Sequence, residues 1–162
     1  MINLGMSGFT RGIAITIATI SELPVLFFSN YLIQRFKALG LLFIGMTITG
    51  LRLILYAVLN FQSGILIFQL INGLTSPLVI VAAVSYANEI APEGMKATAQ
   101  GLWGAMMFGF GAAAGGAAAG LLREGVGSQA MFLLIGIIVL LGVAVIYLLE
   151  RKQKTRQVQG IS

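Results

Sequence analysis

The sequence contains neither cysteine nor histidine among its 162 residues. Without Cys the chain has no disulfide framework. Without either residue it has no Cys/His zinc site and no Ser-His-Asp triad of its own. Charge is also scarce, because only 9% of the residues are charged, whereas a soluble domain carries about 25%. So few charges cannot cover a surface that faces water, which excludes an ordinary soluble domain.

Most of the chain is apolar: 58% of the residues are hydrophobic and the mean hydropathy is +0.97. A helix that crosses a bilayer needs about 20 mostly apolar residues. Five runs satisfy this requirement, at about 12–34, 40–60, 64–88, 97–122 and 129–149. The polar breaks between them are too short for a separate soluble domain. We therefore predict an all-α, polytopic transmembrane bundle over 1–150 and a basic cytoplasmic tail over 151–162.

The net charge of +5 is distributed between the spans, which indicates membrane topology and no nucleic-acid partner. One side of the predicted bundle carries Arg35, Lys37, Lys96, Arg151, Lys152, Lys154 and Arg156. The other side carries only Arg11 and Arg123. The positive-inside rule puts the first side in the cytoplasm, with the N-terminus outside and the C-terminus inside. An outside start and an odd number of spans lead us to expect the C-terminal part of a longer protein, or a truncated gene model.

Two charged residues fall near the centres of predicted spans: Glu22 in the first and Arg52 in the second. A charge there costs at least about 2.5 kcal/mol, and such residues often mark substrate or proton paths. A Glu22–Arg52 pair would offset part of this cost. We favour a functional pair at a water-filled cavity, and the alternative is an ion pair that only fixes helix register.

Polar residues at helical spacing give three of the predicted spans a polar face, and polar faces should turn away from lipid. They comprise Thr19, Glu22 and Ser29, then Gly45, Thr49, Arg52, Tyr56 and Asn60, then Gln69, Asn72, Thr75 and Ser76. We expect the three faces to converge on a common interior. The alternative is interhelical hydrogen bonding that only holds the bundle together, at about 0.6 kcal/mol per contact.

The fourth predicted span is rich in glycine and alanine and contains two GxxxG pairs, Gly111 with Gly115 and Gly116 with Gly120. Such pairs let another backbone approach closely. We expect tight packing within the bundle. A face that slides between conformations and a homodimer contact are the alternatives.

Several segments together resemble the C-terminal half, from the eighth helix to the twelfth, of a major facilitator superfamily transporter. They are Ser21-Glu-Leu-Pro24, Gly50-Leu-Arg52, Asn72-Gly-Leu-Thr-Ser-Pro77 and the loop Ala91-Pro-Glu-Gly-Met-Lys-Ala-Thr-Ala-Gln-Gly101. The layout is most similar to the branch that includes lactose permease and the nucleoside and phenylpropionate proton symporters.

The resemblance implies roles for four residues in substrate binding or coupling. Glu22 matches a substrate-contacting glutamate, and Arg52 matches the arginine that works with a proton-coupling carboxylate. Asn72 and Thr75 stand where lactose permease has its coupling histidine and glutamate. Neither Asn nor Thr exchanges a proton near neutral pH, so coupling through Glu22 and Arg52, or through a missing half, stays open.

The resulting hypothesis is transport of a small polar solute, such as a sugar, nucleoside or small organic acid, by alternating access. Its expected partners are the bilayer of the cell membrane, the solute, a coupling proton and a missing N-terminal transporter half. The alternative is a truncated or non-transporting membrane protein that needs a partner half. No nucleophile–base pair stands out, so we expect neither an enzyme nor a cofactor.

Overall fold

The computed structural model describes the backbone of residues 8–58 and 65–159, and within these ranges every regular element is a helix. The elements in chain order are α1 (Gly8–Phe27), α2 (Ser29–Phe36), α3 (Ala38–Val58), α4 (Ile65–Ile90), α5 (Lys96–Gly104), the π-helix η2 (Ala105–Gly111) and α6 (Ala112–Gln159). The predicted all-α helical bundle is confirmed. The side chains of Arg11, Asn60, Gln69, Lys154 and Arg156 lie outside the described set.

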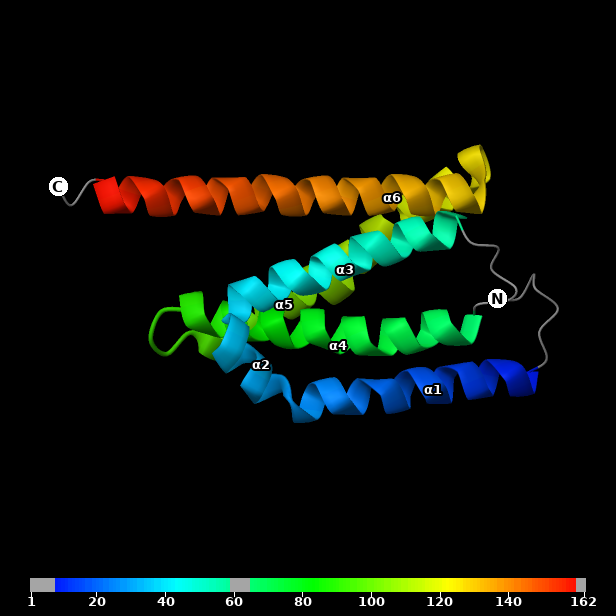
Figure 1. The fold of residues 1–162 in the computed structure, drawn as a ribbon, viewed down its shortest axis with the longest axis horizontal. Coiled ribbons are helices and arrows are strands. Elements are labelled where there is room, and N and C mark those ends of the chain that lie inside the picture. Colours follow the sequence, from blue (N-terminus) through cyan, green and yellow to red (C-terminus); the bar gives the residue numbers. More distant parts are fainter. Residues whose placement is uncertain (1–7, 59–64, 160–162) are drawn as a thin grey trace.

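The first predicted span, 12–34, is divided between α1 and α2 (Figure 1). Pro24 lies inside α1 and removes one backbone donor from it. The helix ends three residues later at Phe27, and the next residue, Phe28, leaves helical geometry with φ −91° and ψ 6°. A second turn follows at Lys37, whose φ of 60° separates α2 from α3. The apolar run is therefore bent at Phe28, and the turn at Lys37 follows its end.

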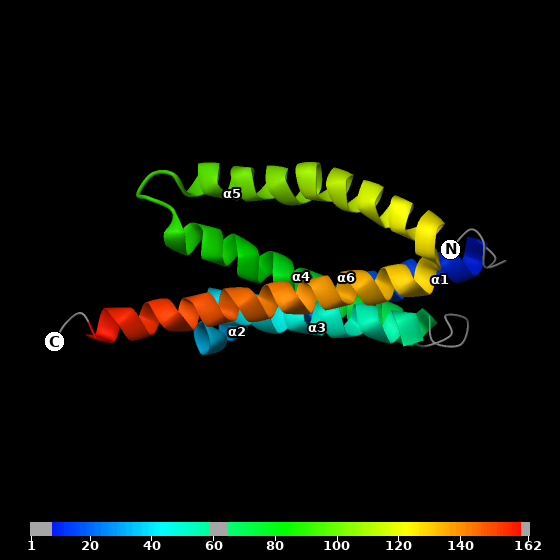
Figure 2. The ribbon, with the colours of Figure 1, turned by 90° about the horizontal axis from the view of Figure 1, so that it is seen from above.

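Three helical segments of the described chain are long and apolar enough to cross a membrane: Ala38–Val58, Ile71–Ile90 and Lys96–Lys152. The last has 57 residues, which would extend about 85 Å as one straight helix, against a hydrocarbon core of about 30 Å. It does not run straight, because Gly127 has the non-helical angles φ 84° and ψ 166°. Figure 2 shows the chain turning back there into an antiparallel pair.

The helix α4 lies between α1 and α3, and α3 in turn packs against the C-terminal part of α6. Small residues make the contact between α3 and α6, as is common between helices in membranes. A methyl group built on Gly136 would lie only 3.0 Å from the carbonyl oxygen of Gly50 and 3.1 Å from the backbone nitrogen of Ile54. The two backbones therefore cross in close contact at Gly50 and Gly136.

The glycine-rich stretch of the fourth predicted span does not pack in this way, so the expectation of tight packing within the bundle is wrong for the described chain. A methyl group built on Gly115, Gly116 or Gly120 would meet no described atom within 4 Å. The group on Gly111 would meet only the Met106 carbonyl oxygen of its own π-helix, at 2.9 Å. This face of the chain stays open because no other described helix lies against it.

Candidate functional site

A polar contact joins the second half of α3 to the first half of α4, where Arg52 donates a hydrogen bond from Nη1 to Oδ1 of Asn72. The Ser76 hydroxyl donates to the same oxygen at 3.2 Å. Asn72 and Ser76 share a face of α4 because four residues separate them. One amide oxygen thus accepts from the guanidinium of the facing helix and from a hydroxyl of its own helix.

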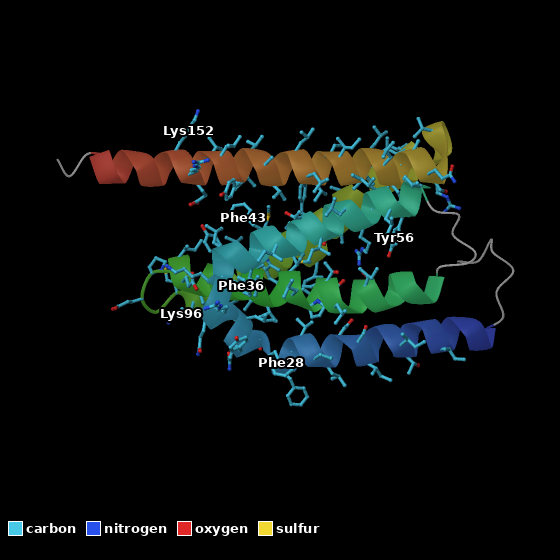
Figure 3. All side chains as sticks on the ribbon, viewed as in Figure 1. Phe28, Phe36, Phe43, Tyr56, Lys96 and Lys152 are labelled. Carbon is cyan, nitrogen blue, oxygen red and sulfur yellow. The ribbon has the colours of Figure 1, made fainter. Side chains whose placement is uncertain are left out.

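The guanidinium of Arg52 also lies over an aromatic side chain. Its Cζ is 5.7 Å from the centroid of the Tyr56 ring, within the range of a cation–π interaction. The Tyr56 ring packs edge-on against Phe132 of α6, with centroids 5.6 Å apart. Figure 3 shows Tyr56 near the Val58 end of α3. Asn72 of α4 and the Tyr56 ring, which itself packs on α6, therefore position Arg52.

One donor of Arg52 is not used by these contacts. Its Nε is buried and has no hydrogen-bond partner in the part of the chain that the structure describes. A buried donor without a partner costs about 1–3 kcal/mol, more for a charged group. The Nε–H group of Arg52 is thus a donor without an acceptor among the described residues, and an oxygen atom is the kind of group that would satisfy it.

Thr75 lies on α4 close to this contact but is itself satisfied. It is only 3% exposed, and its hydroxyl donates to the Ile71 carbonyl oxygen at 2.6 Å. Thr49 on the predicted polar face of α3 behaves alike, donating to Gly45 at 2.9 Å. Such local bonds let a hydroxyl reside in an apolar bundle without an interhelical partner. The predicted convergence of polar faces is therefore carried by Arg52, Asn72, Ser76 and Tyr56.

Glu22 and Arg52 do not form the ion pair that their predicted depths suggest. Glu22 is partly exposed on α1, and α1 packs on α4 without touching α3 among the described residues. Neither an ion pair nor a hydrogen bond of Glu22 is present within the described ranges. Arg52 binds Asn72 instead because α4, and not α1, lies directly against α3.

A second interhelical contact was missed by the sequence analysis. Nε2 of Gln100 donates to Oδ1 of Asn88 at 2.8 Å and links α5 to the end of α4. The intervening turn is closed by Met95 N donating to Pro92 O at 3.0 Å. The sequence analysis identified the loop Ala91–Gly101 that contains Gln100, but it did not predict Asn88 as the partner of this residue.

Residues 1–134 match the MFS_1 like family. The chain therefore belongs to this family of the major facilitator superfamily, a class of helical membrane transporters. It is 31% identical to the maltose permease of Geobacillus stearothermophilus over 144 residues. That match covers 89% of this chain and 36% of the permease, so the chain spans about a third of the length of this curated relative. No solved structure matches the chain.

Proposed function

We propose that this chain forms one wall of the solute path of a secondary transporter that carries a small polar solute by alternating access. Family membership supports a transporter-type function. The similarity to a maltose permease favours a sugar among the solute classes considered, ahead of nucleosides and small organic acids. In this proposal the chain is the C-terminal part of the carrier, which belongs to the proton-symporter branch of the superfamily. It resides in the cell membrane with its C-terminus in the cytoplasm.

The observation that carries the proposal is the buried Arg52 Nε without a partner among the described residues. A purely structural arginine would be expected to have its donors satisfied, because an unpaired buried donor is destabilising. Asn72 fixes one side of the guanidinium and leaves the Nε donor for an incoming ligand. A hydroxyl or carboxylate oxygen of the solute would satisfy it.

The other site residues take different roles in this scheme. Asn72 orients Arg52 and contributes its amide nitrogen to the solute, while Thr75 shapes the wall of α4 beside it. Glu22 supplies a carboxylate on the other side of α4. Of the four residues only Glu22 can exchange a proton by ordinary carboxylate chemistry. We therefore assign proton coupling, and contact with solute during the transport cycle, to Glu22.

The test is uptake of radiolabelled maltose and of a panel of sugars, nucleosides and small organic acids. It is measured in cells that express the chain alone, and in cells that also express any coding sequence in frame upstream. Arg52→Gln and Glu22→Gln should each lower uptake at least about ten-fold, because a hydrogen bond to a charged group contributes about 1.5–3 kcal/mol. Membrane abundance of each variant is measured by immunoblot.

Matched controls remove exposed charges outside this site: Arg35→Gln and Glu89→Gln. Both should keep uptake within about two-fold of the wild type, as surface charges contribute little. Normal uptake by both Arg52→Gln and Glu22→Gln would remove the site assignment. Absence of uptake of every solute in both expression formats would favour a non-transporting membrane protein.

A further inference from the structure

The close crossing of α3 and α6 leaves an open apolar groove on one side of it. Beyond Gly50 and Gly136, toward the start of α3 and the end of α6, the two helices diverge (Figure 1). The groove between them measures about 510 Å³. Its lining comprises Phe43, Ile44, Thr47 and Ile48 of α3 and Leu140, Val143, Ala144 and Tyr147 of α6.

Aromatic rings occupy the wide end of this groove. Phe43 points from α3 toward α6 (Figure 3), and its ring meets that of Tyr147 edge-on at 5.7 Å between centroids. Tyr147 nonetheless keeps 54% of its surface exposed. The hydroxyl of Thr47 donates to Phe43 O at 2.7 Å, so this polar group of the groove is satisfied. The surface offered to an occupant is therefore apolar.

Basic residues stand at the same wide end. Leu140, Ala144, Tyr147 and Arg151 follow one another at helical spacing, so Arg151 continues the groove-lining stripe of α6 one turn beyond Tyr147. Arg151 is exposed, and so is Lys37, which directly precedes α3. The neighbouring charged residues do not continue this stripe. Lys152 projects away from α3 (Figure 3), and Glu150 lies about 70° around α6 from the stripe centre.

The groove is long enough to hold part of one acyl chain. Leu140 to Tyr147 covers about 10 Å of helix axis, a third of a hydrocarbon core of about 30 Å. Arg151 lies about 6 Å further along the axis, beyond the apolar residues that line the groove. An apolar groove with exposed cations at one end complements a molecule with an acyl chain and an anionic head.

We propose that the groove between α3 and α6 is a binding site for an anionic phospholipid. One acyl chain lies between Ile48 and Ala144, and the phosphate group is bound by Arg151 and Lys37. The proposal needs the chain to lie in a membrane but does not depend on transport. A neutral lipid would fill the groove without using the cations, and charge complementarity therefore favours the anionic headgroup.

The experiment uses the full chain in lipid nanodiscs that contain equal amounts of phosphatidylglycerol and phosphatidylcholine. The protein is released into the gas phase, and native mass spectrometry counts the retained molecules of each lipid. The wild type should retain phosphatidylglycerol preferentially. Arg151→Gln should reduce this preference about five-fold, and Lys37→Gln to a similar extent, since each cation near an anionic headgroup contributes about one factor of that size.

Filling the groove tests the acyl-chain position separately. Ala144→Trp should lower the number of retained lipids of both kinds. The matched control Ile138→Trp enlarges a side chain of α6 that does not line the groove and is 64% exposed, and should leave retention unchanged. The charge control is Arg123→Gln, which removes an exposed cation near the turn at Gly127. Circular dichroism verifies that each variant is helical.

Three results would overturn the proposal. Equal retention of the two lipids by the wild type would remove the headgroup site. Equal losses for Ala144→Trp and Ile138→Trp would place the retained lipid elsewhere. A dimer in the wild-type spectra that Ala144→Trp abolishes would show that a second copy of the chain covers the groove.

Discussion

Two glycine-containing regions of this molecule behave in opposite ways. At the crossing of α3 and α6, Gly50 and Gly136 bring two backbones together, with no room for a methyl group on Gly136. Along the fourth predicted span, Gly115, Gly116 and Gly120 face no described atom within 4 Å. The second region has the better GxxxG pattern, yet the first makes the contact. Small residues thus permit a close approach, and the arrangement of the helices decides whether one occurs.

Among the glycine variants of the two regions, Gly136→Ala is expected to lower the free energy of unfolding most. The added methyl group would lie 2.9 Å from Cγ1 of Ile54 and 3.0 Å from the Gly50 carbonyl oxygen, and backbone atoms cannot move aside easily. We expect a loss of about 3 kcal/mol in the free energy of unfolding. The measurement is unfolding of the detergent-solubilised chain by dodecyl sulfate, followed by circular dichroism.

The matched control for this series is Gly142→Ala, because a methyl group there meets nothing within 4 Å and Gly142 belongs to the same helix. It accounts for the helix propensity that alanine adds, about 1 kcal/mol. If Gly136→Ala and Gly142→Ala unfold at the same detergent fraction, α3 and α6 do not cross at Gly136.

Gly127, at the turn between the two regions, is the position where a substitution should have the next largest effect on the free energy of unfolding. Gly127 combines φ 84° with ψ 166°, a conformation that is essentially restricted to glycine. Gly127→Ala should cost about 2 kcal/mol in the same unfolding assay. Gly125→Ala, two residues earlier in helical geometry with open space around it, serves as control. A larger loss for Gly125→Ala would contradict a turn at Gly127.

Gly50→Ala tests the α3 side of the crossing. The new methyl group would lie 2.7 Å from Cδ2 and 2.8 Å from Cγ of Leu140. A leucine side chain can rotate, unlike the backbone that opposes Gly136, so we expect a loss of about 1 kcal/mol. In the Leu140→Ala background, where the clashing atoms are absent, Gly50→Ala should cause little further loss. An equal loss in both backgrounds would indicate a different cause.

The smallest effect is expected from Gly116→Ala in the open region. With no described atom within 4 Å, the change should alter the free energy of unfolding by no more than the Gly142→Ala control, to within about 0.5 kcal/mol. A loss as large as that of Gly136→Ala would show that another chain covers this face in the sample. Sedimentation of the same sample measures whether that chain is a second copy.

Much of the fold could be predicted because apolar length is a direct physical requirement of the bilayer. The predicted span 40–60 nearly coincides with α3, and 64–88 with α4. The bend at Phe28 was harder to predict, since Pro24 is compatible with both bent and continuous helices. Gly127 falls within the break predicted at 123–128, but only its backbone angles show that the chain turns there.

The candidate site was predicted in part. Depth along the chain identified Arg52 as a residue that needs a partner, and helical spacing placed Asn72 on a polar face. The structure brings these two together. Depth also suggested Glu22 as the partner of Arg52, but two helices joined by a short loop need not be neighbours in a bundle. Here α4 packs directly against α3, and its Asn72 binds the Arg52 guanidinium.

The sequence by itself determined that this chain belongs in a membrane as helices, because its scarce charge and long apolar runs leave no other stable arrangement. It also marked the few residues whose burial demands an explanation. Only the tertiary structure decided which of them meet, and which glycines lie in a contact. The physical reason is that burial in a bilayer depends on the composition of each segment, whereas contacts between helices depend on the order in which the segments pack side by side.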